Sequence, residues 1–308
     1  MGFRYDIDVL RRAARASEKP GILDGRAIAA ALRTEVARAV GLLHEQDIQP
    51  RLDVVLIGED PASKIYVRHK VRACEEVGIE SRKHLLADDV SEQELHGLLE
   101  NLSGDPTVYG VLLQLPIPEH LDTVNAIERI AWKRDVDGFH ANNLGRLMAG
   151  RAALEPCTPR GVMTMLRAYD VDLVGKRAVV VGRSIGVGRP MAQMLIRANA
   201  TVTVCHRHTR DLAAMVANAE VLVVATGVPH LIKGEWIRDG AVVVDIGITR
   251  TDDGLRGDVE FDVARRRTSL IAPVPGGVGP MTVATLMENT VRAACARHGV
   301  TIDADGLR

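Results

Sequence analysis

The sequence is poor in aromatic residues and cysteine and carries almost no net charge. Phenylalanine, tryptophan and tyrosine make up 3% of its 308 residues, too few for the stacking platforms that bind single-stranded nucleic acids. Lysine and arginine total 39 against 40 aspartates and glutamates, so the basic excess typical of nucleic-acid-binding proteins is missing. No apolar run reaches the roughly 20 residues needed to span a bilayer. We therefore expect neither a nucleic acid nor a membrane as a partner.

The few cysteines are scattered, and none belongs to a Cys-x-x-Cys motif: they are Cys74, Cys157, Cys205 and Cys295. This pattern fits neither a zinc knuckle nor a dithiol redox motif, and a disulfide framework is not expected in so large and cysteine-poor a chain. The first 20 residues are charged throughout and do not fit a secretory signal. We expect a protein of the reducing cytoplasm whose N-terminal extension, residues 1–20, is a short helix or a frayed end without an assigned role.

Length and hydrophobic pattern predict an α/β protein of about two domains. Hydrophobic residues make up 46% and charged residues 26%, an ordinary globular composition. Apolar runs that suit buried parallel strands lie at 52–58, 108–115, 176–182, 201–205, 221–227 and 241–247. Helical patterns lie at 61–77, 159–169, 187–199, 209–219 and 283–297, and another opens at a capping box of Ser91 and Glu94. Gly78 is the expected C-cap of the first helix and Thr158 the expected N-cap of the helix from Pro159.

The segment 150–157 is the predicted linker between two α/β units. Each unit has its own succession of strands and helices. Ligands commonly bind in a cleft between two such units, so we expect the functional residues of both units to face a shared cleft.

The strongest local signal is the strand-to-helix turn at 182–188, Gly-Arg-Ser-Ile-Gly-Val-Gly. Glycines in such a turn let the backbone approach a pyrophosphate, and the helix N-terminus favours an anion, although Ser184 stands at the second glycine position. The next strand is followed by cationic side chains instead of the acidic residue that reads the NAD ribose: His206, Arg207, His208 and Arg210, with Arg183 in the turn. Cationic residues in place of an acidic one favour NADP over NAD. The alternative is that some of these residues are only solvated charges at the start of a helix. A Gly-x-Ser-x-Gly hydrolase elbow also matches, but no His and Asp partners are evident.

In the first unit, polar residues gather at helix starts and strand ends. Tyr66 and Lys70 lie one helical turn apart and share a helix face, an arrangement that also occurs as surface decoration. Gln114 interrupts an apolar strand end, where it either points at a site or disturbs a core. Asp137 lies in the loop 135–138, where an Asx turn is the alternative. His140 has no second histidine at ligand spacing, so no metal is expected.

Taken together, these segments resemble the bifunctional methylenetetrahydrofolate dehydrogenase/methenyltetrahydrofolate cyclohydrolase family of the bacterial FolD type. The matching stretches, in family order from about residue 22 to residue 298, are Tyr66–Lys70, Gly110–Pro118, Arg134–His140, Asn143–Arg146, Pro156–Pro159, Gly182–Ser184 and Pro273–Thr282. The last stretch, a loop rich in proline and glycine, is highly specific for the family.

The resemblance implies a role for each matching residue. Lys70 would be the catalytic amine, Tyr66 would position the folate, Gln114 would bind and tune Lys70, and Asp137 would hold the pterin. The expected NADP-binding residues are Gly182, Arg183, Ser184, Arg207 and Ile248, and the loop around Pro275, Gly276 and Gly277 would close over folate and nicotinamide. The resemblance also implies two domains: a catalytic domain of residues 21–155, completed by the C-terminal helix 282–308, and a Rossmann-like NADP domain of residues 156–281. It further implies a homodimer formed through the cofactor domain. The family's reactions belong to one-carbon metabolism and purine biosynthesis.

Two residues depart from the family pattern. Gly186 stands where an isoleucine is usual in the cofactor turn, and His69 stands beside Lys70 where a small polar residue is common. The alternatives are therefore a member with dehydrogenase activity alone and, in a different class, a non-catalytic NADP-binding regulator. The retained Lys70 and Asp137 favour the enzyme with both activities.

Overall fold

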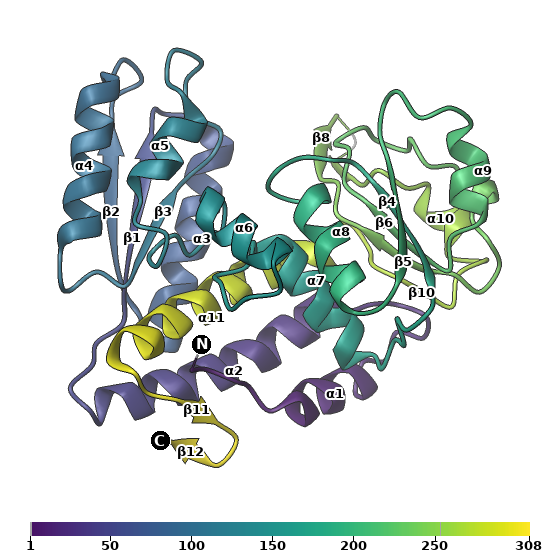
Figure 1. Ribbon diagram of the computed structural model, residues 1–308. Coiled ribbons are helices and arrows are strands. Elements are labelled where there is room, and N and C mark those ends of the chain that lie inside the picture. The colour runs from purple at the N-terminus through teal and green to yellow at the C-terminus, as the bar shows by residue number, and fades with distance from the viewer. Residues whose placement is uncertain (1, 253) are drawn as a thin grey trace. The chain divides into compact units, whose positions relative to one another are not determined.

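The computed structural model describes residues 2–252 and 254–308, and these fall into two compact units. Unit 1 comprises the residues up to Asp6, Leu32–Cys157 and Val283–Arg308, and unit 2 comprises Ile7–Ala31 and Thr158–Thr282. Met1 of the expected N-terminal extension and Asp253 lie outside the described residues. Both units are α/β, and the three-stranded and five-stranded sheets at their centres are parallel, which confirms the predicted fold class (Figure 1).

Unit 1 is built on a three-stranded parallel sheet in the order β2-β1-β3. Its strands are β1 (Arg51–Ile57), β2 (Glu80–Leu86) and β3 (Gly110–Leu113), and its short C-terminal hairpin is formed by β11 (Ile302–Asp303) and β12 (Gly306–Leu307). All side chains of β1 and β3 are buried. For β1 this is expected, because it is the central strand of a sheet covered on both faces.

Helices cover the sheet of unit 1. They are α3 (Pro61–Val77), α4 (Glu92–Gly104), α5 (Thr123–Arg129), α6 (Ala141–Met148) and the larger parts of α2 (Gly25–His44) and α11 (Val278–His298). Leu95, Leu99 and Leu102 recur at helical spacing on α4 and pack in one core with Val55 and Val111 of the strands. This i, i+4, i+7 pattern is the apolar stripe that attaches a helix to a sheet.

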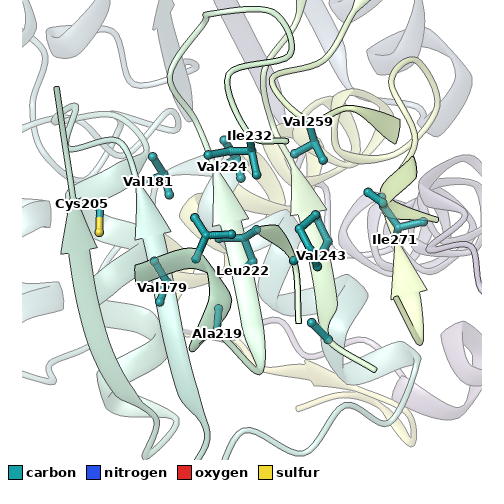
Figure 2. Packing of buried hydrophobic residues seen from close by; sticks show 14 of the residues in the cluster. Val179, Val181, Cys205, Ala219, Leu222, Val224, Ile232, Val243, Val259 and Ile271 are labelled. Carbon is teal, nitrogen blue, oxygen red and sulfur yellow. The ribbon is translucent and has the colours of Figure 1, made fainter. Parts of the chain in front are cut away.

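Unit 2 contains a five-stranded parallel sheet in the order β10-β7-β6-β4-β5. The strands are β4 (Arg177–Val181), β5 (Thr201–Cys205), β6 (Val221–Val224), β7 (Val242–Asp245) and β10 (Leu270–Ile271), and a separate hairpin pairs β8 (Thr249–Thr251) with β9 (Gly254–Arg256). Figure 2 shows Val179 and Val181, Leu222 and Val224, and Val243 gathered on neighbouring strands in one core. The sheet closely resembles the dinucleotide-binding α/β arrangement, in which ligands bind outside the carboxyl ends of the strands.

The helices of unit 2 are α1 (Ile7–Arg15), most of α7 (Cys157–Ala168), α8 (Gly188–Arg197), α9 (Leu212–Ala217), α10 (Phe261–Ala264) and the 3-10 turn η1 (Gly234–Trp236). Helix α8 lies against β4 and β5, which it joins. The strand–helix–strand unit β4-α8-β5 therefore presents the N-terminus of α8 at the carboxyl edge of the sheet.

Local signals placed several boundaries correctly. Helix α3 spans the predicted 61–77, with proline in its first turn and Gly78 closing it in the left-handed conformation at φ 81°. Ser91 and Glu94 form the predicted capping box. Strand β5 occupies the predicted 201–205, β1 lies one residue before the predicted 52–58, and the other predicted strands are present but shorter at one or both ends. In each of these cases the determining interactions lie within a few residues of the boundary.

The starts of α7, α9 and α11 were predicted wrongly. Helix α9 begins at Leu212, three residues after the predicted 209, with Asp211 as its N-cap. Helix α7 begins at Cys157, so Thr158 is a helical residue and not the N-cap, and its hydroxyl pairs with Thr282 at 2.9 Å. Helix α11 begins at Val278, five residues before the predicted 283. Its first turn includes Gly279 and Pro280, which the sequence pattern had placed in the preceding loop. Proline is tolerated there since its missing N–H would have no partner within the helix.

The N-terminal segment is folded in both units rather than frayed. In unit 1, Phe3 forms a parallel bridge with Ile302 of the C-terminal hairpin, and the N–H of Arg4 donates to the Ile302 carbonyl at 2.8 Å. The Phe3 ring is almost completely buried. In unit 2, α1 buries Leu10, and Arg11 forms an ion pair with Asp170 at 2.8 Å.

We expect Phe3→Ala to destabilise unit 1, because it removes a buried ring that ties the N-terminal segment to the hairpin. A loss of about 3 kcal/mol is usual for such a truncation. Urea unfolding monitored by circular dichroism measures it. Arg4→Ala, which changes an exposed side chain and keeps the backbone bond, is the matched control. Equal unfolding midpoints for Phe3→Ala and the wild type would show that the buried Phe3 ring contributes nothing to stability.

Candidate active site

A lysine and a glutamine meet at the carboxyl edge of the unit 1 sheet. Helix α3 follows β1 and carries Lys70, and Gln114 follows directly after β3, the neighbour of β1. The Lys70 Nζ atom donates to Gln114 Oε1 at 2.9 Å. The two side chains therefore come together because parallel neighbouring strands end at the same edge of a sheet.

Gln114 is held in one orientation by its own backbone and side-chain amide. Its N–H donates to the carbonyl of Val55 at 2.9 Å, which prolongs the β1–β3 ladder by one residue. Its Nε2 group donates to the carbonyl of Leu115 at 2.6 Å. With the amide N–H₂ engaged in this way, the carbonyl oxygen faces Lys70, and the amine has a neutral acceptor as its hydrogen-bond partner.

Asp137 lies in a loop that is folded around a different carboxylate. The buried Asp135 accepts hydrogen bonds from Gly138 N at 3.1 Å, His140 N at 2.8 Å and Asn143 Nδ2 at 2.9 Å. Asp135 thus makes the Asx-type turn that the motif allows. The carboxylate of Asp137, two residues later, is therefore available to bind a ligand.

The same loop is also held by hydrogen bonds from Asn289 of α11, whose side chain is completely buried. Its Nδ2 group donates to the carbonyls of Val136, at 2.8 Å, and Glu155, at 2.9 Å. The Sγ atom of Cys157 also donates to the Val136 carbonyl, at 3.2 Å. The peptide that precedes Asp137 is therefore fixed by two side chains from separate helices.

Charge and burial oppose each other at Asp137. Burial raises the pKa of its carboxyl group, whereas the positive charge of Lys70 and a hydrogen bond with Cys157 lower that pKa. Burial, together with the negative charge of Asp137, raises the pKa of the Cys157 thiol well above its usual range. Cys157 is consequently a neutral hydrogen-bond donor at physiological pH and not a thiolate nucleophile.

Tyr66 lies on α3 one turn before Lys70, with 46% of its side chain exposed. An exposed phenol ring at this position is free to pack against a flat substrate ring. His69, next to Lys70, is also exposed. Unit 1 thus brings Lys70 and Gln114 into direct contact and places Asp137 within electrostatic reach of Lys70.

In unit 2, the turn between β4 and α8 is closely packed against the backbone. Gly182 has φ 121°, and a Cβ atom there would overlap the carbonyl oxygen of Ala225. A Cβ atom at Gly188, the first residue of α8, would overlap the carbonyl oxygen of Gly182. Both positions therefore require glycine, and the helix N-terminus stays accessible from the carboxyl edge, as a pyrophosphate site needs.

Exposed cationic side chains surround this turn. Arg183 and Ser184 lie within it, and Arg207 follows β5, where its Nε donates to His208 Nε2 at 3.1 Å. No acidic residue occurs between β5 and Arg210. The residues present fit NADP, whose 2′-phosphate requires positive partners where the NAD ribose would require a carboxylate.

Two further segments of unit 2 contain predicted site residues. Ile248, in the loop after β7, is exposed. The loop 273–277 is closed by a hydrogen bond from Gly277 N to the Pro273 carbonyl at 2.8 Å, with Pro275 exposed and Gly276 at φ 109°. The structure places these residues in unit 2, whereas Lys70, Gln114 and Asp137 belong to unit 1.

Three supporting residues, Asp135, Cys157 and Asn289, were not predicted as functional from the sequence. Asp135 and Cys157 lie inside recognised motifs, but a motif alone does not say which of two nearby aspartates folds the loop. Asn289 had a visible signal, since it is a polar residue within the apolar helix 283–297. A buried amide in such a place normally bonds to backbone groups.

Some absences can be stated for the described part of the chain. No helix within 2–252 and 254–308 is long and apolar enough to cross a membrane. Nor does any group of three His, Cys, Asp or Glu side chains in these ranges lie close enough together to hold a metal ion.

The parallel sheets, the glycine turn with its cationic surroundings and the Lys70–Gln114 pair define a dinucleotide-dependent α/β enzyme. Comparison with known families identifies it more closely. The model of the catalytic domain of tetrahydrofolate dehydrogenase/cyclohydrolase matches residues 23–137, and that of the NAD(P)-binding domain of the same family matches residues 156–298. The chain belongs to the tetrahydrofolate dehydrogenase/cyclohydrolase family.

Individual relatives agree with this assignment. The chain is 53% identical over 274 residues to "Bifunctional protein FolD 2" of Geobacter metallireducens, an alignment that covers 89% of this chain and 96% of the relative. Among solved structures, the bifunctional FolD enzyme of Campylobacter jejuni superposes with a TM-score of 0.89 at 44% identity, covering 91% of this chain and all of the other. The dehydrogenase-cyclohydrolase of Trypanosoma brucei, in complex with NADP and an inhibitor, has a TM-score of 0.87 at 37% identity and covers 92% and 99%.

Proposed function

We propose that the protein is a bifunctional enzyme of folate metabolism. It oxidises 5,10-methylenetetrahydrofolate to 5,10-methenyltetrahydrofolate with NADP⁺ and then hydrolyses the methenyl compound to 10-formyltetrahydrofolate. The observation that carries this proposal is the Lys70–Gln114 hydrogen bond, with Asp137 in electrostatic reach. Similarity to bifunctional FolD proteins over nearly the whole chain supports it.

The two reactions make different demands on unit 1. When bound, NADP⁺ accepts the hydride that leaves the methylene carbon of the folate, a step that needs alignment of two rings but no protein base. Hydrolysis of the methenyl cation needs more, because a proton must leave the attacking water and another must reach the departing ring nitrogen. Lys70 is the residue that we assign to this proton transfer.

Gln114 suits the role of partner to such an amine. Its oxygen orients Lys70 without adding a negative charge that would stabilise the ammonium form. A nearby methenyl cation disfavours a second positive charge, so the substrate itself helps to release the proton from Lys70. Gln114 thus contributes geometry, and the substrate contributes the electrostatic change.

Asp137 and Tyr66 are the residues that we assign to folate binding. An ionised Asp137 can accept two parallel hydrogen bonds from the amino and ring N–H groups of a pterin. The exposed Tyr66 ring can stack on the folate beside Lys70. Asp135 and Asn289 hold the loop that presents the Asp137 carboxylate.

We assign cofactor binding to unit 2. Gly182 and Ser184 of the turn would face the pyrophosphate, Arg183 and Arg207 the 2′-phosphate, and Ile248 would lie against the nucleotide from the neighbouring loop. The loop that contains Pro275, Gly276 and Gly277 is proposed to contact folate and nicotinamide. The NADP bound to the Trypanosoma brucei relative supports the choice of cofactor.

We further propose that the protein is a homodimer of the cytoplasm. Strand β5 is the edge of its sheet and is poorly covered, with Val204 40% exposed, and Ile196 of the adjoining α8 is 51% exposed. An apolar strand edge of this kind is suited to pairing with a second copy of the chain. The four cysteines are buried free thiols, which suits a reducing compartment.

Lys70→Met tests the division of labour between the two reactions. The substitution keeps most of the stem and removes the amine. We expect methenyl hydrolysis to fall by about two orders of magnitude or more, the usual size of a general acid–base contribution. Dehydrogenation should fall less, so methenyltetrahydrofolate should accumulate and be visible by its absorbance.

Lys64→Met on the same helix, where the lysine pairs with Glu59, is the matched control. Methenyl hydrolysis at the wild-type rate in Lys70→Met would disprove the assignment and direct attention to His69. A wild-type protein that reduces NADP⁺ but never hydrolyses methenyltetrahydrofolate would be a dehydrogenase alone. One that binds NADP without either reaction would be a regulator.

Replacing Arg183 and Arg207 together with alanine tests the cofactor preference. A charge-assisted hydrogen bond contributes roughly 1.5–3 kcal/mol, which is about tenfold or more in affinity. We expect the dissociation constant for NADPH to rise by at least about that factor while the constant for NADH changes little, as measured by fluorescence titration. Arg265 and Arg266, which follow α10, supply the control pair. Equal losses for both cofactors would rule out recognition of the 2′-phosphate by these arginines.

The proposed dimer can be tested by placing a charge on the β5 edge. We expect Val204→Asp to convert dimers into monomers in sedimentation experiments, because a carboxylate would be buried in the interface. Val124→Asp changes an apolar residue of unit 1 that is more exposed than Val204, 60% against 40%, and should leave the assembly intact. A dimer that persists in Val204→Asp would place the interface elsewhere.

A further inference from the structure

Two buried carboxylates lie together at the carboxyl edge of the five-stranded sheet, outside the residues assigned so far. Asp245 is the last residue of β7, and Asp258 follows strand β9. Both side chains are almost completely buried. Burial raises the pKa of Asp245 to about 7, and the charge of Asp258 also raises it, whereas the N–H groups around Asp245 lower it. A buried pair of this kind is costly unless hydrogen bonds compensate it.

Asp258 fixes the loop that follows β6. Its Oδ2 atom accepts hydrogen bonds from Thr226 N at 2.6 Å, Thr226 Oγ1 at 2.9 Å and Gly227 N at 3.0 Å. The next residue, Val228, is exposed. A single carboxylate oxygen therefore accepts three hydrogen bonds from this loop.

Asp245 fixes the loop that follows β7. Its carboxylate accepts hydrogen bonds from Gly247 N at 3.1 Å, Asp258 N at 3.1 Å and Val259 N at 3.0 Å. Ile248, the residue proposed to touch the nucleotide, comes directly after Gly247. Since Asp245 also holds the backbone of Asp258, the two carboxylates form one connected network.

The loops are joined to each other as well. Thr249 Oγ1 donates to the Gly227 carbonyl at 3.3 Å. A Cβ atom at Gly247 would overlap the Asp258 carboxylate, and one at Gly257 would overlap the Asp245 carboxylate. Asp258 Oδ1, buried against Gly247, has no hydrogen-bond partner among the residues described. The carboxylates are thus packed directly on backbone, where only a side chain of the same size and shape could replace them.

We infer that Asp245 and Asp258 are positioning residues for the cofactor, which hold the loops of Val228 and Ile248 in the conformation that receives the nucleotide. This inference rests on the proposed function, because it takes the carboxyl edge of unit 2 as the NADP site. A loop that is ordered only part of the time lowers the apparent affinity by the fraction that is ordered. Loss of the network therefore weakens cofactor binding without touching the lysine chemistry of unit 1.

Asp258→Ala tests the inference through two readouts. We expect the dissociation constant for NADPH, from fluorescence titration, to rise at least about tenfold, which corresponds to a loop ordered a tenth of the time. Hydrolysis of supplied methenyltetrahydrofolate, which consumes no NADP⁺, should stay close to the wild-type rate. Asp258→Asn keeps a carbonyl oxygen for Thr226 and Gly227 and should restore most of the affinity.

Val243→Ala is the matched control, because it opens a cavity in β7 of the same core without altering the loops. It should lower the melting temperature and leave NADPH affinity unchanged. Should Asp258→Ala fail to fold, Thr226→Val removes one donor to Asp258 and should still weaken NADPH binding measurably.

Wild-type NADPH affinity in Asp258→Ala, or an equal loss in Val243→Ala, would overturn the inference and leave the proposed function standing. Wild-type protein that binds no NADPH at all would instead overturn the proposed function.

Discussion

The loop that presents Asp137 is folded around the carboxylate of Asp135, and the loops at the cofactor edge are folded around those of Asp245 and Asp258. In each unit, the cost of burying a carboxyl group is compensated by backbone N–H groups, and the backbone is fixed in return. An unpaired buried carboxylate would be strongly destabilising, so the loop must close on it. This mutual dependence gives irregular segments the rigidity that strands and helices have from their own ladders.

The same constraint distinguishes residues that hold the backbone from residues that bind a substrate or transfer a proton. Asp135 is surrounded by donors and has no capacity left for a ligand, whereas Asp137 has Lys70 and Cys157 near it and remains available. The neutral Gln114 follows the same division, because it fixes the position of the Lys70 amine without adding a charge beside it. Residues that hold the backbone are thus distinct from residues whose protonation or pairing can change when a substrate binds.

The sequence predicted those features that depend on neighbouring residues. Helix α3 was predicted correctly because Pro61 and Gly78 mark both of its ends, and the glycine turn at 182–188 was recognised because its geometry is local. The start of α7 was missed because the choice between Cys157 and the predicted Pro159 as the first residue depends on tertiary partners of Cys157, including Asn289, more than 130 positions away. Neither α2 nor β2 was predicted from the pattern. Likewise, no local rule distinguishes Asp135 from Asp137, since the difference lies in which of them meets the amide of Asn143.

Phe3 forms a single parallel bridge with Ile302, about 300 positions later in the sequence. A contact between residues so far apart in the sequence cannot form until the folding of the intervening segments has brought its two partners together. Contacts of such large sequence separation form slowly and late. Until this bridge forms, the Phe3 ring, which is buried in the folded chain, is exposed to solvent.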